Sequence, residues 1–160
     1  MVTPTVIPSV RAVKEFVGKP IGPSDWIEVT QERIGLFAEA TEDHQWIHVD
    51  PERAQRESIF GGPVAHGYLT LSLAPALLNQ ILRVEGNPTV LNTGIQRMKL
   101  SAPVPSGSRV RMRCEILRAR EGPTGGVSAV FRMIIEVEGA EKPALSADVS
   151  LAYLPSDGAA

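Results

Sequence analysis

One long apolar helical stretch followed only by strand-like sequence constrains the fold of this 160-residue chain most strongly. Over residues 66–83, apolar side chains such as Leu69, Leu73 and Leu77 recur at the spacing of a helix. A helix that is apolar around most of its circumference is usually buried, so we expect this one to form the centre of the core. Pro75 lacks a backbone N–H and predicts a local bend within the helix.

Strand-like sequence fills the chain after this helix. Apolar and polar side chains alternate over residues 109–116, 127–137 and 145–153, a pattern typical of strands with one buried face and one wet face. Another strand-like segment precedes them and ends near Lys99. Turn sequences separate the strands and predict antiparallel neighbours joined by short loops. These turns lie at residues 103–107, 122–126 and 139–143.

One helix combined with four long strands predicts the α+β class, with a curved antiparallel sheet wrapped around the helix. The size of the chain predicts a single domain over residues 1–160, with an N-terminal arm at 1–23 and a core at 24–155. A single sheet with one helix leaves strand edges and one face uncovered. We therefore expect a homodimer.

The first third of the chain predicts short elements. Residues 1–23 are rich in proline and predict an arm with no more than one or two helical turns, and residues 24–29 predict a short strand. Thr30 predicts the N-cap of a helix over residues 31–40. Asp50 followed by Pro51 predicts the start of a second, short helix.

Composition indicates an ordinary globular protein, with 43% hydrophobic and 21% charged residues. The single cysteine, Cys114, alternates with charged residues and predicts a buried structural thiol. No disulfide can form within the chain, and no apolar stretch approaches the roughly 20 residues that cross a bilayer, so we expect a cytoplasmic protein with no membrane partner.

Basic residues are concentrated in one part of the sequence. Residues 97–120 hold seven of the 16 lysines and arginines and only one acid, Glu115, although the whole chain has a net charge of -2. This window predicts either a solvated face of a strand pair or a surface that binds a phosphorylated ligand. No aromatic residue lies among these charges to stack on bases, which argues against a nucleic-acid partner.

Asp43 and His48 form the first candidate site. A non-helical loop of this length brings a carboxylate and an imidazole to the same water molecule, which suits general acid-base catalysis. The alternative is structural: Asp43 caps a turn and His48 fills a polar pocket. A metal site is a third reading, but Asp43, His44 and His48 match no common zinc spacing, so we expect no metal.

His66 and Gly67 form the second candidate site, at the start of the apolar helix. The free N–H groups of a helix N-terminus stabilise a carbonyl oxygen that gains negative charge, and glycine lets a ligand approach the backbone. The alternative is that these residues serve only the turn before the helix.

Two ordered motifs resemble a known enzyme family. The sequence Asp43-His44-Gln45-Trp46-Ile47-His48, with Ala54 after it, resembles the hydratase-2 signature of the MaoC-like (R)-specific enoyl-CoA hydratases. The sequence HGYLTLSL from His66 resembles the start of the central helix in that family, and the K-L-x-A-P-V pattern at 99–104 is also similar. The resemblance covers roughly residues 24–155 and is greatest to the nodulation protein N-like branch.

The resemblance implies a hotdog fold and a reaction. The reaction is the addition of water to a trans-2-enoyl thioester to give the (R)-3-hydroxyacyl thioester, or its reverse, without a metal or redox cofactor. By the resemblance, Asp43 and His48 activate the water, a backbone N–H near Gly67 receives the thioester carbonyl, and Ser72 lines the site. The family signature has glycine, asparagine and proline at three positions where this chain has Glu42, Gln45 and Trp46.

The remaining expectations concern the substrate. We expect Gln45 and His66 to contribute to substrate binding, and Arg97 of the basic window to meet the phosphates of coenzyme A or of an acyl carrier protein. Two further functions suit the same fold, because a fold alone does not determine function. One is an acyl-CoA thioesterase, and the other is a non-catalytic subunit that binds acyl thioesters.

Overall fold

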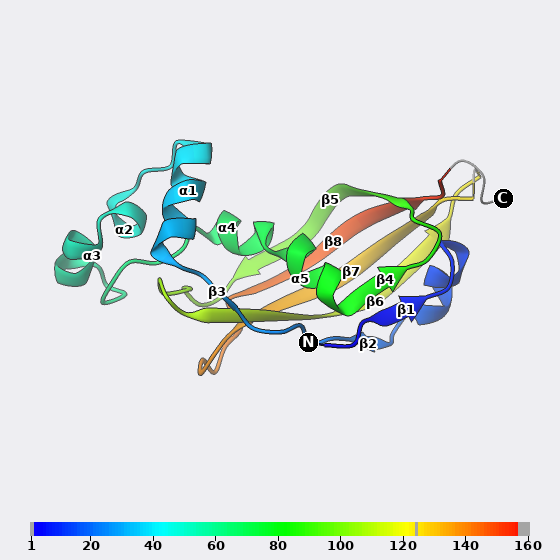
Figure 1. Ribbon diagram of the computed structural model, residues 1–160, viewed down its shortest axis with the longest axis horizontal. Helices are drawn as coiled ribbons and strands as arrows, with labels where there is room; N and C mark the ends of the chain where they lie inside the picture. Colours follow the sequence, from blue (N-terminus) through cyan, green and yellow to red (C-terminus); the bar gives the residue numbers. More distant parts are fainter. Residues whose placement is uncertain (1, 124, 157–160) are drawn as a thin grey trace.

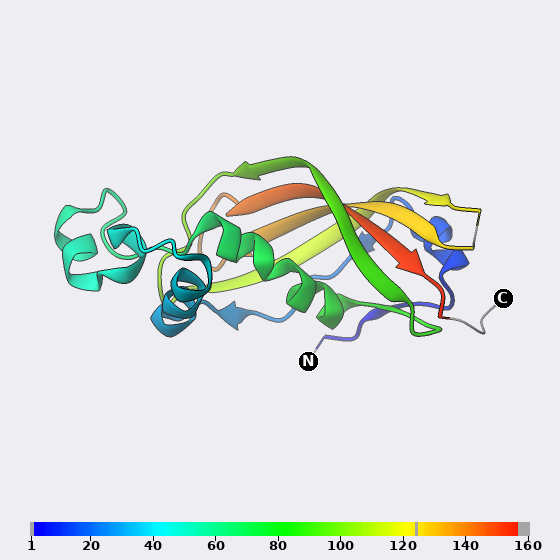
Figure 2. The same ribbon diagram turned by 90° about the horizontal axis from the view of Figure 1, so that it is seen from above.

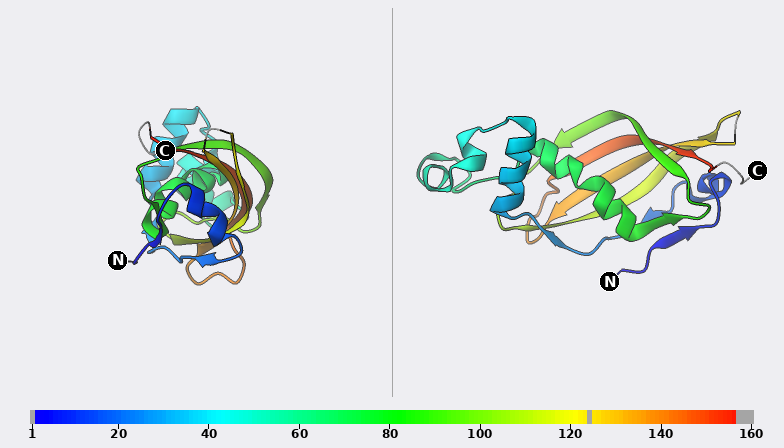
Figure 3. Two further views of the ribbon diagram at one scale, coloured as in Figure 1. Left: turned by 90° about the vertical axis from the view of Figure 1, so that its right-hand side faces the viewer. Right: turned by 45° about the horizontal axis from the view of Figure 1, so that its top comes forward.

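A curved antiparallel sheet wraps around a central helical rod in the computed structural model, which describes residues 2–123 and 125–156 (Figures 1 and 3). The rod consists of α4 (Gly67–Ser72) and α5 (Ala74–Ile81). The α+β class predicted from the sequence is confirmed. The main sheet has the order β2-β6-β7-β8-β5, and β3 also pairs with β6. Its long strands are β5 (Thr89–Leu100), β6 (Arg109–Glu121), β7 (Val127–Val137) and β8 (Leu145–Leu154).

Two of the three predicted strand connections are confirmed. β6 pairs with β7 and β7 pairs with β8, both antiparallel, through turns at the predicted positions. The prediction for the turn at 103–107 was wrong, because β5 pairs with β8 and not with β6. The segment after β5 therefore crosses from one edge of the sheet towards the other. Alternation shows which face of a strand is buried, but it does not show which strand is its neighbour.

The core lies between the concave face of the sheet and one face of the rod. Met112, Phe131 and Ile135 of the sheet are fully buried, and so is Leu77 of α5. Cys114 is buried among them, and burial raises the pKa of its thiol to about 12. A thiol that stays protonated in this way is a poor nucleophile, which confirms the structural interpretation of Cys114.

The central rod differs from the predicted helix in three respects. The helix is interrupted at Leu73 and resumes with Pro75 in its first turn, where a missing N–H costs no hydrogen bond. It ends at Ile81, and β4 (Leu82–Val84) follows directly. The rod is also less buried than predicted, because Tyr68, Ser72 and Asn79 lie on an exposed side that the sheet does not reach.

The N-terminal arm packs on the core. β1 (Thr5–Ile7) pairs in parallel with β4, the 3-10 helix η1 (Arg11–Phe16) follows it, and β2 (Pro20–Ile21) joins the main sheet. Ile7 and Val13 are fully buried in the same hydrophobic cluster as the rod and the sheet. The division into a single domain with an arm and a core remains a prediction. The predicted strand at 24–29 is reduced to β3 (Ile27–Glu28).

Three helices project beyond the end of the sheet (Figures 1 and 2). They are α1 (Gln31–Thr41), α2 (Trp46–Val49) and α3 (Pro51–Glu57). Thr30 caps α1 and Asp50 caps α3, as predicted, by accepting hydrogen bonds from backbone N–H groups. The prediction that His48 lies in a non-helical loop was wrong. It lies in the single turn of α2, where Trp46 stacks under the Arg53 guanidinium on the outside of the turn.

The basic window lies on β5 and β6, and three of its seven basic residues form ion pairs. Arg109 forms an ion pair with Glu138, and Arg111 and Arg113 both pair with Glu136. These contacts favour the interpretation as a solvated strand face. Within residues 2–123 and 125–156, no helix is long and apolar enough to span a membrane.

Candidate active site

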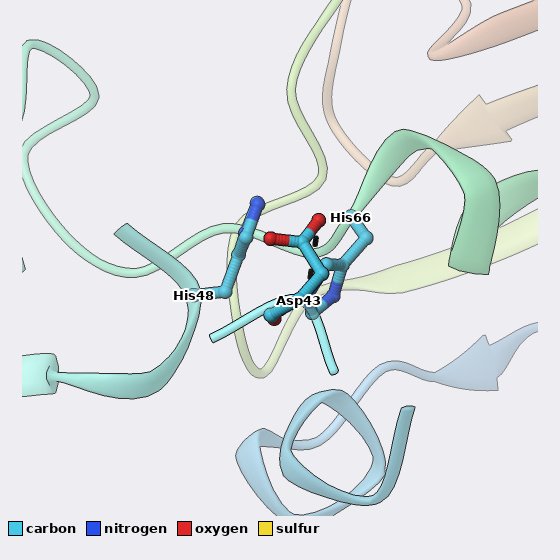
Figure 4. Close-up of side chains that lie close together, drawn as sticks. All are labelled: Asp43, His48 and His66. Carbon is cyan, nitrogen blue, oxygen red and sulfur yellow. Dashed lines mark hydrogen bonds and ion pairs between the residues drawn. The ribbon is translucent and has the colours of Figure 1, made fainter. Parts of the chain in front are cut away.

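Three side chains from separate segments meet where the projecting helices α1, α2 and α3 join the central rod. Asp43 follows α1, His48 lies in α2, and His66 is the N-cap residue of α4. One ligand atom of each lies within 4.8 Å of the others. Figure 4 shows the Asp43 carboxylate beside the two imidazole rings. The Asp43 side chain is 54% exposed, whereas His48 and His66 are buried, so solvent reaches the site from the carboxylate side.

Backbone geometry places Asp43. Glu42 adopts a left-handed conformation, with φ 59° and ψ 18°, and so ends α1 and turns the chain towards the rod. The Asp43 carboxylate then accepts a weak hydrogen bond of 3.4 Å from the backbone N–H of Gln45. One turn of helix follows, in which the backbone N–H of His48 donates to the Gln45 carbonyl. The turn is held from α1 by the Gln31 amide, which donates to the His48 carbonyl at 2.6 Å.

Hydrogen bonding assigns the protonation of His48. Its Nδ1 lies 2.6 Å from the carbonyl oxygen of Val64, which only accepts, so Nδ1 carries the proton and donates. Burial lowers the pKa of His48, and the nearby His66 adds to this effect, while the Val64 carbonyl and Asp43 oppose it. His48 is therefore neutral near pH 7 and has an unprotonated Nε2 that can accept a proton.

His66 contacts both Asp43 and His48. Its Nε2 lies 2.9 Å from the backbone carbonyl of Asp43, and its ring stacks on the ring of His48 at a centroid distance of 3.8 Å. The Phe37 ring lies 5.0 Å away on a tilted plane. The sequence predicted a substrate-binding role for His66 and did not place it against Asp43 and His48. The signal available was that all three histidines of the chain fall between residues 43 and 66.

The spacing of Asp43 and His48 suits a shared water molecule. Two polar atoms that each bind one water at about 2.8 Å, at a near-tetrahedral angle, are separated by about 4.6 Å. The ligand atoms of the cluster lie within 4.8 Å of one another, which is compatible with one such water. A metal ion fits less well, because each imidazole binds a metal in its own ring plane. The rings of His48 and His66 are stacked with only 28° between their planes, so an ion close to both rings would lie outside at least one ring plane.

The other predicted site residues lie around this cluster. Gly67 is the first residue of α4, and a Cβ there would overlap a methyl group of Leu100, whose side chain would have to move. Gln45 is exposed at the N-cap of α2. Ser72 lies one and a half turns along the rod and donates to the Tyr68 carbonyl at 2.7 Å. Arg97 is exposed in β5, three residues before Leu100, whose side chain lies against Gly67.

A cavity of about 920 Å³ runs beside the rod, between its exposed side and strands β5 and β8. Leu71 and Ser72 of α4 line the end of the cavity that is nearer to His66 along the rod. Apolar side chains such as Met133 and Leu151 line its floor. Asp43, His48 and His66 do not line it. The separation from His66 to Ser72 along the helix axis is about 9 Å, at 1.5 Å per residue.

A sheet curved around a helical rod, with a carboxylate and an imidazole at the amino end of that rod, defines a hotdog-fold protein. The chain belongs to the MaoC-like dehydratase family, since the model of the MaoC like domain matches residues 13–137. This confirms the resemblance that the two motifs predicted.

Individual relatives agree with this assignment. The chain is 43% identical to 3-hydroxyacyl-thioester dehydratase Z of Mycobacterium tuberculosis, over 91% of this chain and 96% of that protein. It is 40% identical to nodulation protein N of Rhizobium leguminosarum bv. viciae, over 88% of each. The solved structure of the (R)-hydratase from A. caviae superimposes with a TM-score of 0.66 at 25% identity, covering 87% of this chain and 96% of that one. The predicted hotdog fold is confirmed.

Proposed function

We propose that this chain is a 3-hydroxyacyl-thioester dehydratase, which in reverse is an (R)-specific enoyl-thioester hydratase. The observation that carries the proposal is the neutral His48, whose Nδ1 is held by the Val64 carbonyl and one ring nitrogen of which lies within 4.8 Å of an Asp43 carboxylate oxygen. The names of two relatives, the dehydratase of M. tuberculosis and the (R)-hydratase of A. caviae, support the same reaction.

In the hydration direction, His48 and Asp43 hold the water between them. As the water oxygen bonds to Cβ, His48 Nε2 takes one of its protons, and the electrons of the double bond move to Cα and the thioester oxygen. Asp43 accepts a hydrogen bond from the other proton and stabilises the imidazolium. His48 then returns its proton to Cα. The product has gained one hydroxyl and one hydrogen, and the enzyme is unchanged.

The thioester oxygen needs a donor while it carries negative charge. We assign this role to a backbone N–H near Gly67 at the start of α4, as the family resemblance implies. In this proposal Gln45 and Ser72 border the bound thioester. The acyl chain would enter the cavity that begins at Leu71 and Ser72, where the floor is apolar.

The proposal includes a homodimer built on β5. All twelve residues of this edge strand are exposed, among them Val90, Ile95 and Met98. A long apolar edge strand in solution pairs readily with another strand, and a second copy would cover it. Coenzyme A or an acyl carrier protein would carry the acyl group, with Arg97 as a contact for phosphate. The cytoplasm, where a chain with one cysteine needs no disulfide, is the proposed location.

The test is turnover by the purified protein of crotonyl-CoA and of (R)-3-hydroxybutyryl-CoA. The proposal expects loss of the enoyl absorbance with the first substrate and its appearance with the second, with no free thiol released. Release of thiol, detected with a thiol reagent, would instead indicate a thioesterase. Binding without turnover, across a panel of acyl-chain lengths, would indicate a non-catalytic subunit.

A further inference from the structure

His66 contacts both members of the proposed catalytic pair, Asp43 through its Nε2 atom and His48 through the face of its ring. We propose that His66 is a positioning residue, which fixes the Asp43 backbone through its Nε2–H and the His48 ring through stacking, and does not touch the substrate. This inference rests on the proposed function of Asp43 and His48. It replaces the expectation that His66 binds substrate.

Burial excludes a direct contact with substrate. His66 is 2% exposed. One side of its ring meets the His48 ring at 3.8 Å and Phe37 lies 5.0 Å away, while Nε2 is occupied by the Asp43 carbonyl at 2.9 Å. The remaining polar atom, Nδ1, is buried and has no hydrogen-bond partner among the described residues. A ring enclosed in this way acts only through its neighbours.

The hydrogen bond from His66 holds the backbone of Asp43 in place, because few contacts hold the Asp43 carboxylate. The Asp43 side chain is more than half exposed, and the hydrogen bond that it accepts from the Gln45 backbone is long at 3.4 Å. Because a carbonyl only accepts, the Nε2 of His66 must donate, which fixes the neutral tautomer with a lone pair on Nδ1. The orphaned Nδ1 is the consequence of directing the single N–H of the ring at Asp43.

The contact with His48 fixes the plane of the ring that accepts the proton. Four groups face His48: the Val64 carbonyl at Nδ1, the Gln31 amide at its backbone oxygen, the Asp43 carboxylate and the His66 ring. The Val64 carbonyl restrains the ring through Nδ1, and the stacked His66 ring restrains it from one face, so loss of the stack leaves the ring held at a single atom. As the pH falls, a positive charge on either of the two stacked rings would repel a positive charge on the other, so His66 also lowers the pKa of His48.

Two substitutions separate the two contacts. Gln at this position keeps an amide donor near the place of Nε2 but removes the stack, whereas Phe keeps the stack and removes the donor. We expect His66→Gln and His66→Phe each to lower kcat at least about tenfold with KM changed less than about threefold, because small misplacements of catalytic groups are costly. His44→Gln is the matched control. His44 is exposed beside Glu39, and both kinetic constants should stay at wild-type values.

Further readouts distinguish positioning from a general loss of structure. In His66→Gln the acid limb of the pH profile of kcat/KM should move to higher pH, because the repulsion that keeps His48 neutral is removed. Thermal unfolding identifies a variant that fails to fold, and the other variant then carries the test. Long-range ¹H–¹⁵N spectra of the wild-type imidazoles should find the proton of His66 on Nε2, which requires no activity.

The outcomes are distinct. A higher KM with unchanged kcat would return His66 to a substrate-binding role, and unchanged kcat in both folded variants, or a proton on Nδ1, would overturn the inference. A wild-type protein with no dehydratase activity would instead refute the proposed function, and the spectra would still test the position of the His66 proton.

Discussion

Replacing Glu42 by glycine should stabilise the protein, because Glu42 occupies a backbone conformation that L side chains rarely adopt. Its φ of 59° ends α1 and directs the chain into Asp43. The family signature has glycine at this position, and the left-handed φ gives a physical reason for it. Asp43 is the next residue, so the strain lies directly beside the proposed carboxylate.

The expected gain follows from two opposing terms. A left-handed conformation costs a non-glycine residue about 1 to 2 kcal/mol, which the substitution removes. Glycine gives back about 0.5 to 1 kcal/mol, because its unfolded state has more backbone freedom. We expect the free energy of unfolding to rise by about 0.5 to 1 kcal/mol, and Tm to rise by about 1 to 4 °C for a chain of this length.

The assay is denaturant unfolding of the wild type, Glu42→Gly and Glu42→Ala, together with turnover. The alanine variant also lacks the Glu42 side chain but keeps a Cβ in the left-handed position, so it should show no comparable gain. Turnover of the glycine variant should stay within about twofold of wild type, since the backbone path to Asp43 is unchanged. Equal stabilities of the glycine and alanine variants would show that conformational strain at Glu42 does not limit stability.

Three further predictions address α1, His48 and metal. Gly35 lies inside α1 with open space where the methyl group of an alanine would lie, so Gly35→Ala should raise the free energy of unfolding by about 0.5 to 1 kcal/mol in a denaturant titration. Folding lowers the pKa of His48 from 6.5, so the folded protein binds fewer protons than the unfolded chain below that pH. The free energy of unfolding should therefore fall as the pH drops below 6.5, and this fall should be weaker in His48→Gln. Dialysis against a chelator should leave turnover unchanged, whereas activity that is lost and then restored by one divalent ion would assign Asp43, His48 and His66 to a metal.

Local sequence signals predicted most of the elements but not how they are arranged. Alternation identified β6, β7 and β8, and caps at Thr30 and Asp50 identified the starts of two helices, because these signals act within a few residues. The pairing of β5 with β8 depends on where the rod lies against the sheet, which no local pattern records. The exposed side of the rod could not be predicted either, because an apolar helix appears the same whether a sheet or a second subunit covers it.

The site was predicted in part. Asp43 and His48 were found from their spacing and the family motif, and the structure brings them together. The predicted loop between them contains one helical turn, closed by backbone hydrogen bonds from His48 to Gln45 and from Asp50 to Trp46. The place of His66 depends on the return of the chain after α3, across 23 residues from Asp43. A contact of that kind arises from the tertiary fold, and the sequence alone could show only that the three histidines are close along the chain.

The most direct test of the shared-water site is the turnover of crotonyl-CoA by Asp43→Asn, with the folded state checked by thermal unfolding. Asparagine preserves the shape of the side chain and removes the charge that orders the water and stabilises the imidazolium. We expect kcat to fall at least about 100-fold while Tm stays close to that of the wild type. Wild-type turnover by a folded Asp43→Asn protein would contradict the assignment of Asp43 and, with it, the proposed use of a water shared with His48.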